Sequence, residues 1–66
     1  MTKTEVFSTI KEANKLVELM GAYNTNSREY DDLNYALGLL LDSLMYDKRR
    51  AFTLHMSKNG KYFVKY

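Results

Sequence analysis

The chain contains no cysteine and only one histidine, His55. Without cysteine no disulfide can hold a small fold together, and cysteine-free chains are typical of reducing compartments. Zinc sites are usually built from Cys and His, so a single histidine would need carboxylates as co-ligands. We therefore expect no structural metal and a cytoplasmic protein.

Long apolar runs are also missing. The longest is Leu39–Leu41, whereas a membrane-spanning helix needs about 20 apolar residues. Charged side chains interrupt the N-terminal stretch, so no apolar signal-peptide region can be drawn through Lys3, Glu5, Lys11, Glu12 and Lys15. We expect neither membrane insertion nor secretion.

Residues suited to catalysis are few and scattered. The serines stand outside any nucleophile-elbow pattern, and the three glycines are isolated, so they form no phosphate-binding loop. Glu29, Asp31 and Asp32 lie close together, but no EF-hand loop or Glu-x-x-His pair accompanies them. The sequence therefore predicts no catalytic residue, no cofactor, no small-molecule substrate and no enzyme activity.

The net charge of +2 hides an uneven distribution. Residues 48–66 hold six basic side chains and no acidic one, whereas residues 1–47 hold four basic and eight acidic side chains. Such asymmetry favours an acidic partner for the C-terminal part. The alternative is that these basic residues lie after a helix end and on an exposed hairpin, and contact only solvent.

The first predicted element is a helix over about residues 3–20. Thr2 and Glu5 have the spacing of a capping box. Apolar residues then recur at spacings of three and four, which places one stripe on a single helix face: Val6, Ile10, Ala13, Val17 and Met20. Gly21 follows, where we expect a left-handed residue to end the helix.

A second helix is predicted over about residues 27–48. Asn26 or Ser27 can cap it, and Lys48, Arg49 and Arg50 would complement its negative C-terminal dipole. The core stripe consists of Tyr30, Leu33, Leu37, Leu40, Leu41 and Leu44.

This second helix carries an additional apolar line on its opposite side, formed by Tyr35, Leu39 and Tyr46 with Asp42 between them. Gly38 on the flank leaves room for close backbone approach at a cost of about 1 kcal/mol in helix propensity. A helix that is apolar on two sides is covered on two sides. The second cover is either the hairpin or another chain, so these four residues are a candidate partner or dimer interface.

In the C-terminal part apolar residues recur at every second position, which predicts two strands that form a hairpin over about residues 51–66. A two-residue loop at Asn59-Gly60 would mix apolar and polar residues on each face. A three-residue loop pairs Ser57 with Lys61 and requires Gly60 to be left-handed. We choose this register because it lines up one apolar face, formed by Phe52, Leu54, Met56, Tyr62, Val64 and Tyr66.

The expected architecture is therefore one α+β domain over residues 1–66, with an antiparallel helix pair followed by a C-terminal hairpin. We expect a small regulatory protein that binds, and regulates or inhibits, a protein partner, and that forms a homodimer through its second helix. The alternative is a nucleic-acid-binding protein that uses cations and an exposed aromatic of the C-terminal part. The residues of that surface are Lys48, Arg49, Arg50, His55, Lys58, Lys61, Phe63 and Lys65.

Overall fold

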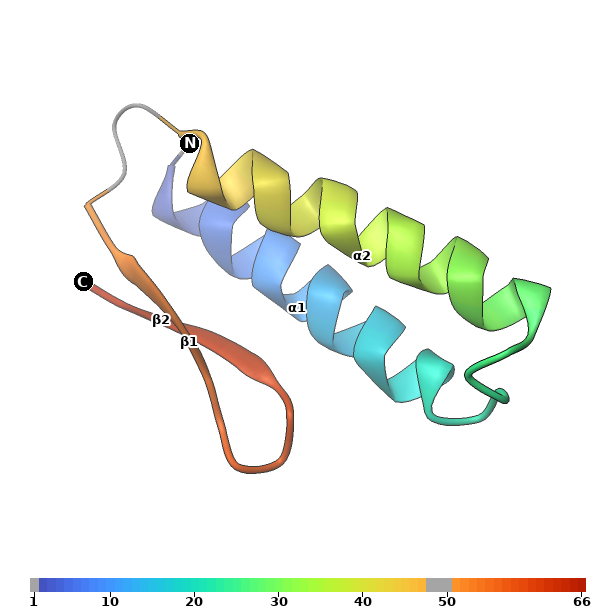
Figure 1. Ribbon diagram of the computed structural model, residues 1–66. Helices are drawn as coiled ribbons and strands as arrows, with labels where there is room; N and C mark the ends of the chain where they lie inside the picture. The colour runs from blue at the N-terminus through green and yellow to red at the C-terminus, as the bar shows by residue number, and fades with distance from the viewer. Residues whose placement is uncertain (1, 48–50) are drawn as a thin grey trace.

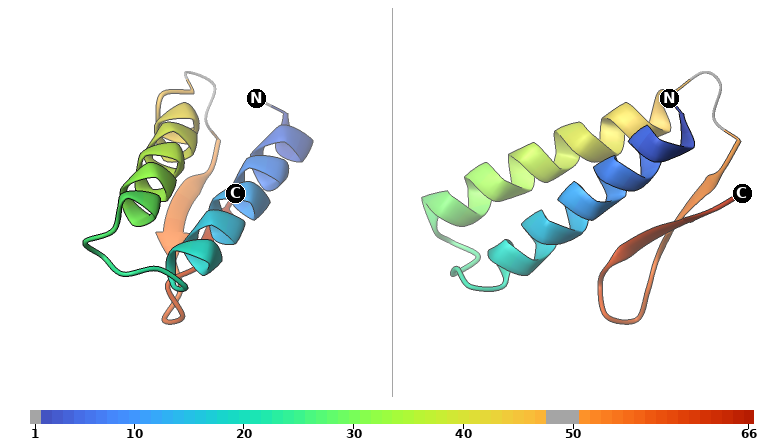
Figure 2. Two further views of the ribbon diagram at one scale, coloured as in Figure 1. Left: turned by 90° about the vertical axis from the view of Figure 1, so that its right-hand side faces the viewer. Right: turned by 180° about the vertical axis from the view of Figure 1, so that it is seen from behind.

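The computed structural model describes residues 2–47 and 51–66. Two helices, α1 (Lys3–Met20) and α2 (Arg28–Met45), are followed by two antiparallel strands, β1 (Thr53–Met56) and β2 (Tyr62–Lys65). The helices run antiparallel to each other, and the hairpin lies on one side of the pair (Figures 1 and 2). The predicted α-α-β-β order is confirmed. Neither helix combines the length and the apolar character that a membrane crossing requires.

Helix α1 begins where the capping box predicts. The Glu5 amide donates to Thr2 Oγ1 at 3.2 Å, and the Thr2 amide donates to Glu5 Oε1 at 3.3 Å. The predicted end at Gly21 is confirmed, but the left-handed conformation is wrong, since Gly21 has φ −63°. Instead, the amides of Ala22 and Tyr23 donate to carbonyls three residues earlier and satisfy the last turn in a right-handed backbone.

Helix α2 begins after Ser27, whose side chain accepts a hydrogen bond from the Tyr30 amide at 3.1 Å. It ends at Met45, with Tyr46 as the C-cap, so the predicted end near residue 48 is too late. Lys48, Arg49 and Arg50 lie outside the described residues, as does their expected interaction with the helix dipole.

The hairpin has the predicted register. The Ser57 amide donates to the Lys61 carbonyl at 2.8 Å, and Gly60 has φ 80°. Phe52 is buried on the inner face, where Leu54, Tyr62 and Val64 are half-buried. Met56 and Tyr66 belong to the same face, but the prediction that they are buried is wrong, because 58% and 51% of their surfaces are exposed.

The buried core is small and falls into two clusters. The first contains Val6, Ile10, Leu44 and Phe52, against which the hairpin residues pack. The second contains Ala13, Met20 and Leu37, between the two helices. The hairpin lies mainly against α1: β2 approaches α1, whereas no Cα atom of either strand comes within 8 Å of α2.

Candidate functional site

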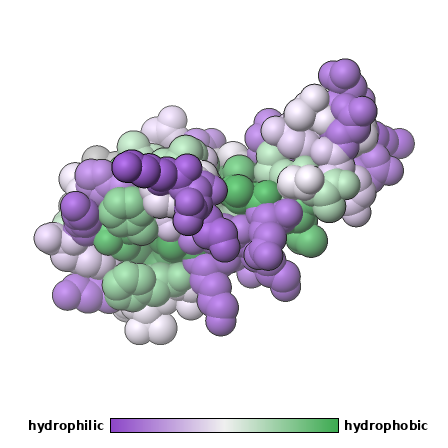
Figure 3. Space-filling model, turned by 90° about the horizontal axis from the view of Figure 1, so that it is seen from below, coloured by the Kyte–Doolittle hydropathy of each residue, from purple (hydrophilic) through white to green (hydrophobic). Residues whose placement is uncertain are grey.

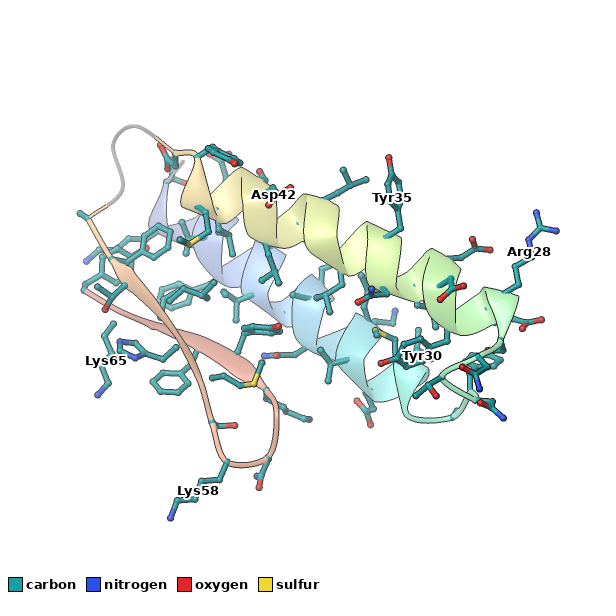
Figure 4. The ribbon with its side chains drawn as sticks, viewed as in Figure 1. Arg28, Tyr30, Tyr35, Asp42, Lys58 and Lys65 are labelled. Carbon is teal, nitrogen blue, oxygen red and sulfur yellow. The ribbon has the colours of Figure 1, made fainter. Side chains whose placement is uncertain are left out.

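The outward face of α2 carries the additional apolar line predicted from the sequence. Tyr35, Leu39 and Tyr46 are 72%, 55% and 80% exposed, and Asp42 between them is exposed as well. Tyr35 and Asp42 project from the side of α2 that faces away from α1 and the hairpin (Figure 4). The alternative in which the hairpin buries this line is therefore wrong. We call these four residues the α2 stripe.

The surroundings of the α2 stripe are acidic and open. At about 100° per residue, Arg28, Asp31 and Asp32 lie near its N-terminal end, so the exposed face carries one basic and, with Asp42, three acidic side chains. A Cβ atom added to Gly38 would meet nothing within 4 Å. No other part of the described chain therefore uses the space that the glycine leaves beside the stripe.

The outer face of the hairpin gathers the described members of the basic surface. The rings of His55 and Phe63 stack with centroids 5.3 Å apart and an interplanar angle of 20°. Lys65 Nζ lies 5.9 Å from the Phe63 centroid, and His55 Nε2 lies 2.9 Å from Thr53 Oγ1. Lys58 and Lys61 are exposed near the turn. Five of the eight predicted residues thus come together on this hairpin, and the other three lie outside the described residues.

Asn14 joins α1 to the hairpin, a contact that the sequence pattern did not predict. Its Nδ2 donates to the Tyr62 carbonyl at 2.9 Å, and the Tyr62 amide donates to Asn14 Oδ1 at 2.6 Å. One side-chain amide therefore binds both polar groups of one strand residue, as a neighbouring strand would. The only sequence signal is an asparagine, a poor helix former, in the middle of a strong helix.

A second unpredicted contact fixes the end of β2. The Tyr66 ring lies 6.1 Å from the ring of Phe7 and 5.8 Å from that of Phe52, and Lys3 Nζ lies 4.7 Å above it. An open hollow of about 740 Å³ lies along α1, lined by eight of its residues, Phe7 and Ile10 among them, and by Lys61 of the hairpin. Figure 3, which views the molecule from below, shows hydrophobic atoms reaching the surface in several places between hydrophilic side chains. The lining of this hollow mixes basic, acidic, polar and apolar side chains, so it does not favour one class of ligand.

Metal-binding groups do not converge in the described part of the chain. Within residues 2–47 and 51–66, no three His, Asp or Glu side chains lie close enough to hold a metal ion, and no polar side chain is buried. Comparisons of this chain with protein-family models, with curated proteins and with solved structures found no match.

Proposed function

We propose that this protein is a non-enzymatic interaction module that binds a protein partner stoichiometrically through the α2 stripe and thereby regulates or inhibits it. The observation that carries the proposal is the exposure of Tyr35, Leu39 and Tyr46 on a helix face that no described element covers. Each apolar side chain that a partner buries contributes about 1.5–3 kcal/mol. Tyrosine is suited to this role because it offers a large rigid ring at a low entropic cost.

The shape of the whole molecule supports the same proposal. Its accessible surface is 5098 Å², whereas a compact monomer of 7.8 kDa exposes about 4,400 Å². Its radius of gyration is 12.3 Å, against about 11 Å expected for a compact chain of this length. The fold leaves more surface in contact with water than its size requires. Of the ten large apolar side chains that are exposed in the described part of the chain, four lie on α2 or at its C-terminal end: Tyr35, Leu39, Met45 and Tyr46.

The chemistry of the α2 stripe indicates what the partner offers. The spacing of four, three and four residues presents one line of side chains along the helix, as in helices that bind in a groove. The acidic rim favours a partner whose groove is apolar at its centre and basic at its edge.

The homodimer expected from the sequence would use this same surface and stays a prediction. An antiparallel pair of α2 helices centred on Tyr35 would place Arg28 beside Asp42 of the second copy, but it would also bring two acidic faces together. Light scattering at about 1 mM chain, a concentration that reveals even weak self-association, separates the cases. A dimer that Leu39→Asp converts to a folded monomer makes the second copy the partner, whereas a monomer leaves the stripe to another protein.

The test of a protein partner compares matched variants. Tagged wild-type protein, Leu39→Asp on α2 and Lys15→Asp on the exposed side of α1 are used to capture proteins from the same extract, followed by quantitative mass spectrometry. Both substitutions introduce the same side chain, and circular dichroism checks that both variants fold. We expect a protein that the wild type and Lys15→Asp retain and that Leu39→Asp loses about tenfold or more. Equal capture by all three chains would contradict a role for the stripe.

A second function is favoured by one observation, the gathering of His55, Phe63 and three lysines on the hairpin. A nucleic-acid-binding protein that contacts Z phosphates of duplex DNA loses affinity with a log–log salt slope of about −0.9Z. Replacing Lys61 and Lys65 with alanine should flatten that slope by about one unit per lost phosphate contact. Failure to bind any DNA or RNA at low salt would eliminate this alternative.

A further inference from the structure

The two edges of the hairpin are not equivalent. Since the Ser57 amide donates to the Lys61 carbonyl, the antiparallel alternation makes Leu54–Val64 and Met56–Tyr62 non-hydrogen-bonded pairs. The amides and carbonyls of these four residues therefore point away from the hairpin, those of Leu54 and Met56 on the β1 edge and those of Tyr62 and Val64 on the β2 edge.

The β2 edge is occupied and protected. Asn14 binds both the amide and the carbonyl of Tyr62, and α1 lies along this strand. Lys61 and Lys65 also place charges on β2 and beside it, a common protection of exposed edges.

Among residues 2–47 and 51–66, nothing gives the β1 edge any of these features. No described residue donates to or accepts from the outward backbone groups of Leu54 and Met56. The strand Thr53–Met56 contains no lysine, no proline and no acidic residue. Its inner-face Met56 is 58% exposed, so the apolar side next to the open edge is also uncovered. An unprotected edge beside an uncovered apolar side chain has the features of a site for an added strand.

We propose that β1 binds an extended segment of a partner protein, which adds a third strand to the hairpin and alternates apolar with acidic side chains. The outward groups of Leu54 and Met56 would form about four hydrogen bonds with such a strand. The apolar residues of the segment would face the helices and cover Met56. The acidic residues would lie on the outer face, beside the surface that carries His55, Lys58, Lys61 and Lys65.

The packing of α2 decides between this occupant and a second copy of the chain. Phe52, which precedes β1, belongs to the same core cluster as Leu44 of α2, and β2 rather than β1 approaches α1, so a strand added beside β1 lies on the α2 side of the sheet. Two copies joined by β1 around a two-fold axis would have to place both helix pairs on the same sheet face, on either side of the joined edge. A single extended segment brings no second helix pair to that face, and its acidic side chains would complement the nearby lysines, which a second basic hairpin would not.

This docking surface is distinct from the α2 stripe, and its test uses defined peptides. The probes are a blocked heptapeptide of alternating valine and glutamate, the same residues in an order without alternation, and a valine–lysine version. We expect the valine–glutamate peptide to bind with a dissociation constant below about 1 mM. We also expect it to slow hydrogen exchange of the Leu54 and Met56 amides by about tenfold or more. The other two peptides should bind at least about tenfold more weakly.

Two variants at residue 56 separate the contribution of the backbone amide from that of the side chain. Met56→Pro removes the outward amide without breaking a hydrogen bond inside the hairpin, and proline is tolerated on such an edge. Met56→Val is the matched control, because valine has the same number of side-chain carbons as proline and keeps the backbone amide. We expect Met56→Pro to weaken peptide binding about tenfold or more relative to Met56→Val.

Four results would overturn the proposal. They are no binding of the valine–glutamate peptide by the wild type at about 1 mM, equal binding by the two Met56 variants, protection confined to the α2 stripe, and concentration-dependent protection of Leu54 and Met56 without peptide. The last would make a second copy the occupant of the edge. If Met56→Pro fails to fold, the exchange pattern of the wild-type protein with the three peptides decides alone.

Discussion

Helices α1 and α2 have the same length of 18 residues and similar serine or threonine caps, yet the fold uses them differently. α1 contacts α2 on one side and the hairpin on another, through Asn14 and the contact of Phe7 with Tyr66. α2 shares one side with α1 and keeps the α2 stripe in water. Besides α2, α1 also packs against the hairpin, whereas the outward side chains of α2 contact no other described element.

The largest expected effect distinguishes the inner and outer faces of α2. Leu44 is fully buried between α1 and Phe52, so Leu44→Ala should cost about 3–5 kcal/mol, which is comparable to the whole stability of a domain this small. Leu39→Ala removes the same atoms from the same helix and should cost less than about 0.5 kcal/mol. Urea unfolding followed by circular dichroism measures both. Similar losses would mean that the stripe belongs to the core.

The next effect tests the hairpin side of α1. Asn14→Ala leaves the amide and carbonyl of Tyr62 without their partners in a half-buried position, so it should cost about 1–3 kcal/mol. Asn34→Ala, at an exposed position of α2, is the matched control and should stabilise the protein slightly, by about 0.5 kcal/mol, because alanine is the better helix former. If thermal melts of the two variants coincide, the Asn14 contact does not stabilise the fold.

A smaller effect of opposite sign is expected beside the stripe. Gly38→Ala should stabilise the protein by about 1 kcal/mol, because alanine favours the helix and the added methyl group meets no neighbour. Gly60→Ala should instead destabilise it, since Gly60 has φ 80° in the turn. Chemical denaturation measures the change in the free energy of unfolding for each variant, and so its sign. A stabilised Gly38→Ala that binds a partner less well would show that the partner occupies this space.

The smallest expected effect is that of Leu39→Asp on stability. Aspartate is a poorer helix former than leucine by about 0.5 kcal/mol, and no packing is lost at this exposed site. The variant should therefore melt close to the wild type while losing partner binding. A variant that unfolds would indicate that α2 is covered on both sides.

Helix starts and the hairpin register could be predicted wherever the local sequence pattern is compatible with only one structure. The capping box set the start of α1, and only one hairpin register gave a clean apolar face. The α2 stripe was also visible as a second line at helical spacing. The prediction erred where local structure allows two solutions: a right-handed turn replaced the left-handed Gly21, and α2 stopped before the basic run.

The position of the hairpin could not be predicted from periodicity. The sequence offered a second apolar line on α2 as a surface for it, whereas the hairpin packs mainly on α1. That choice depends on tertiary contacts between residues far apart in the chain, such as Asn14 with Tyr62 and Phe7 with Tyr66. The difference between the two hairpin edges follows from those contacts, so it could not be read from the strands alone.

The Asn14–Tyr62 pair also has a kinetic consequence, because it joins residues 48 positions apart in the chain. Contacts within each helix and within the hairpin turn are local and form quickly, whereas docking the hairpin on α1 closes a long loop and is the slower step. Once folded, the hairpin should open and reclose as one unit while the helix pair stays intact. Native-state hydrogen exchange should then show two groups of amides, with those of β1 and β2 exchanging through a lower-energy opening than those of the helix interface.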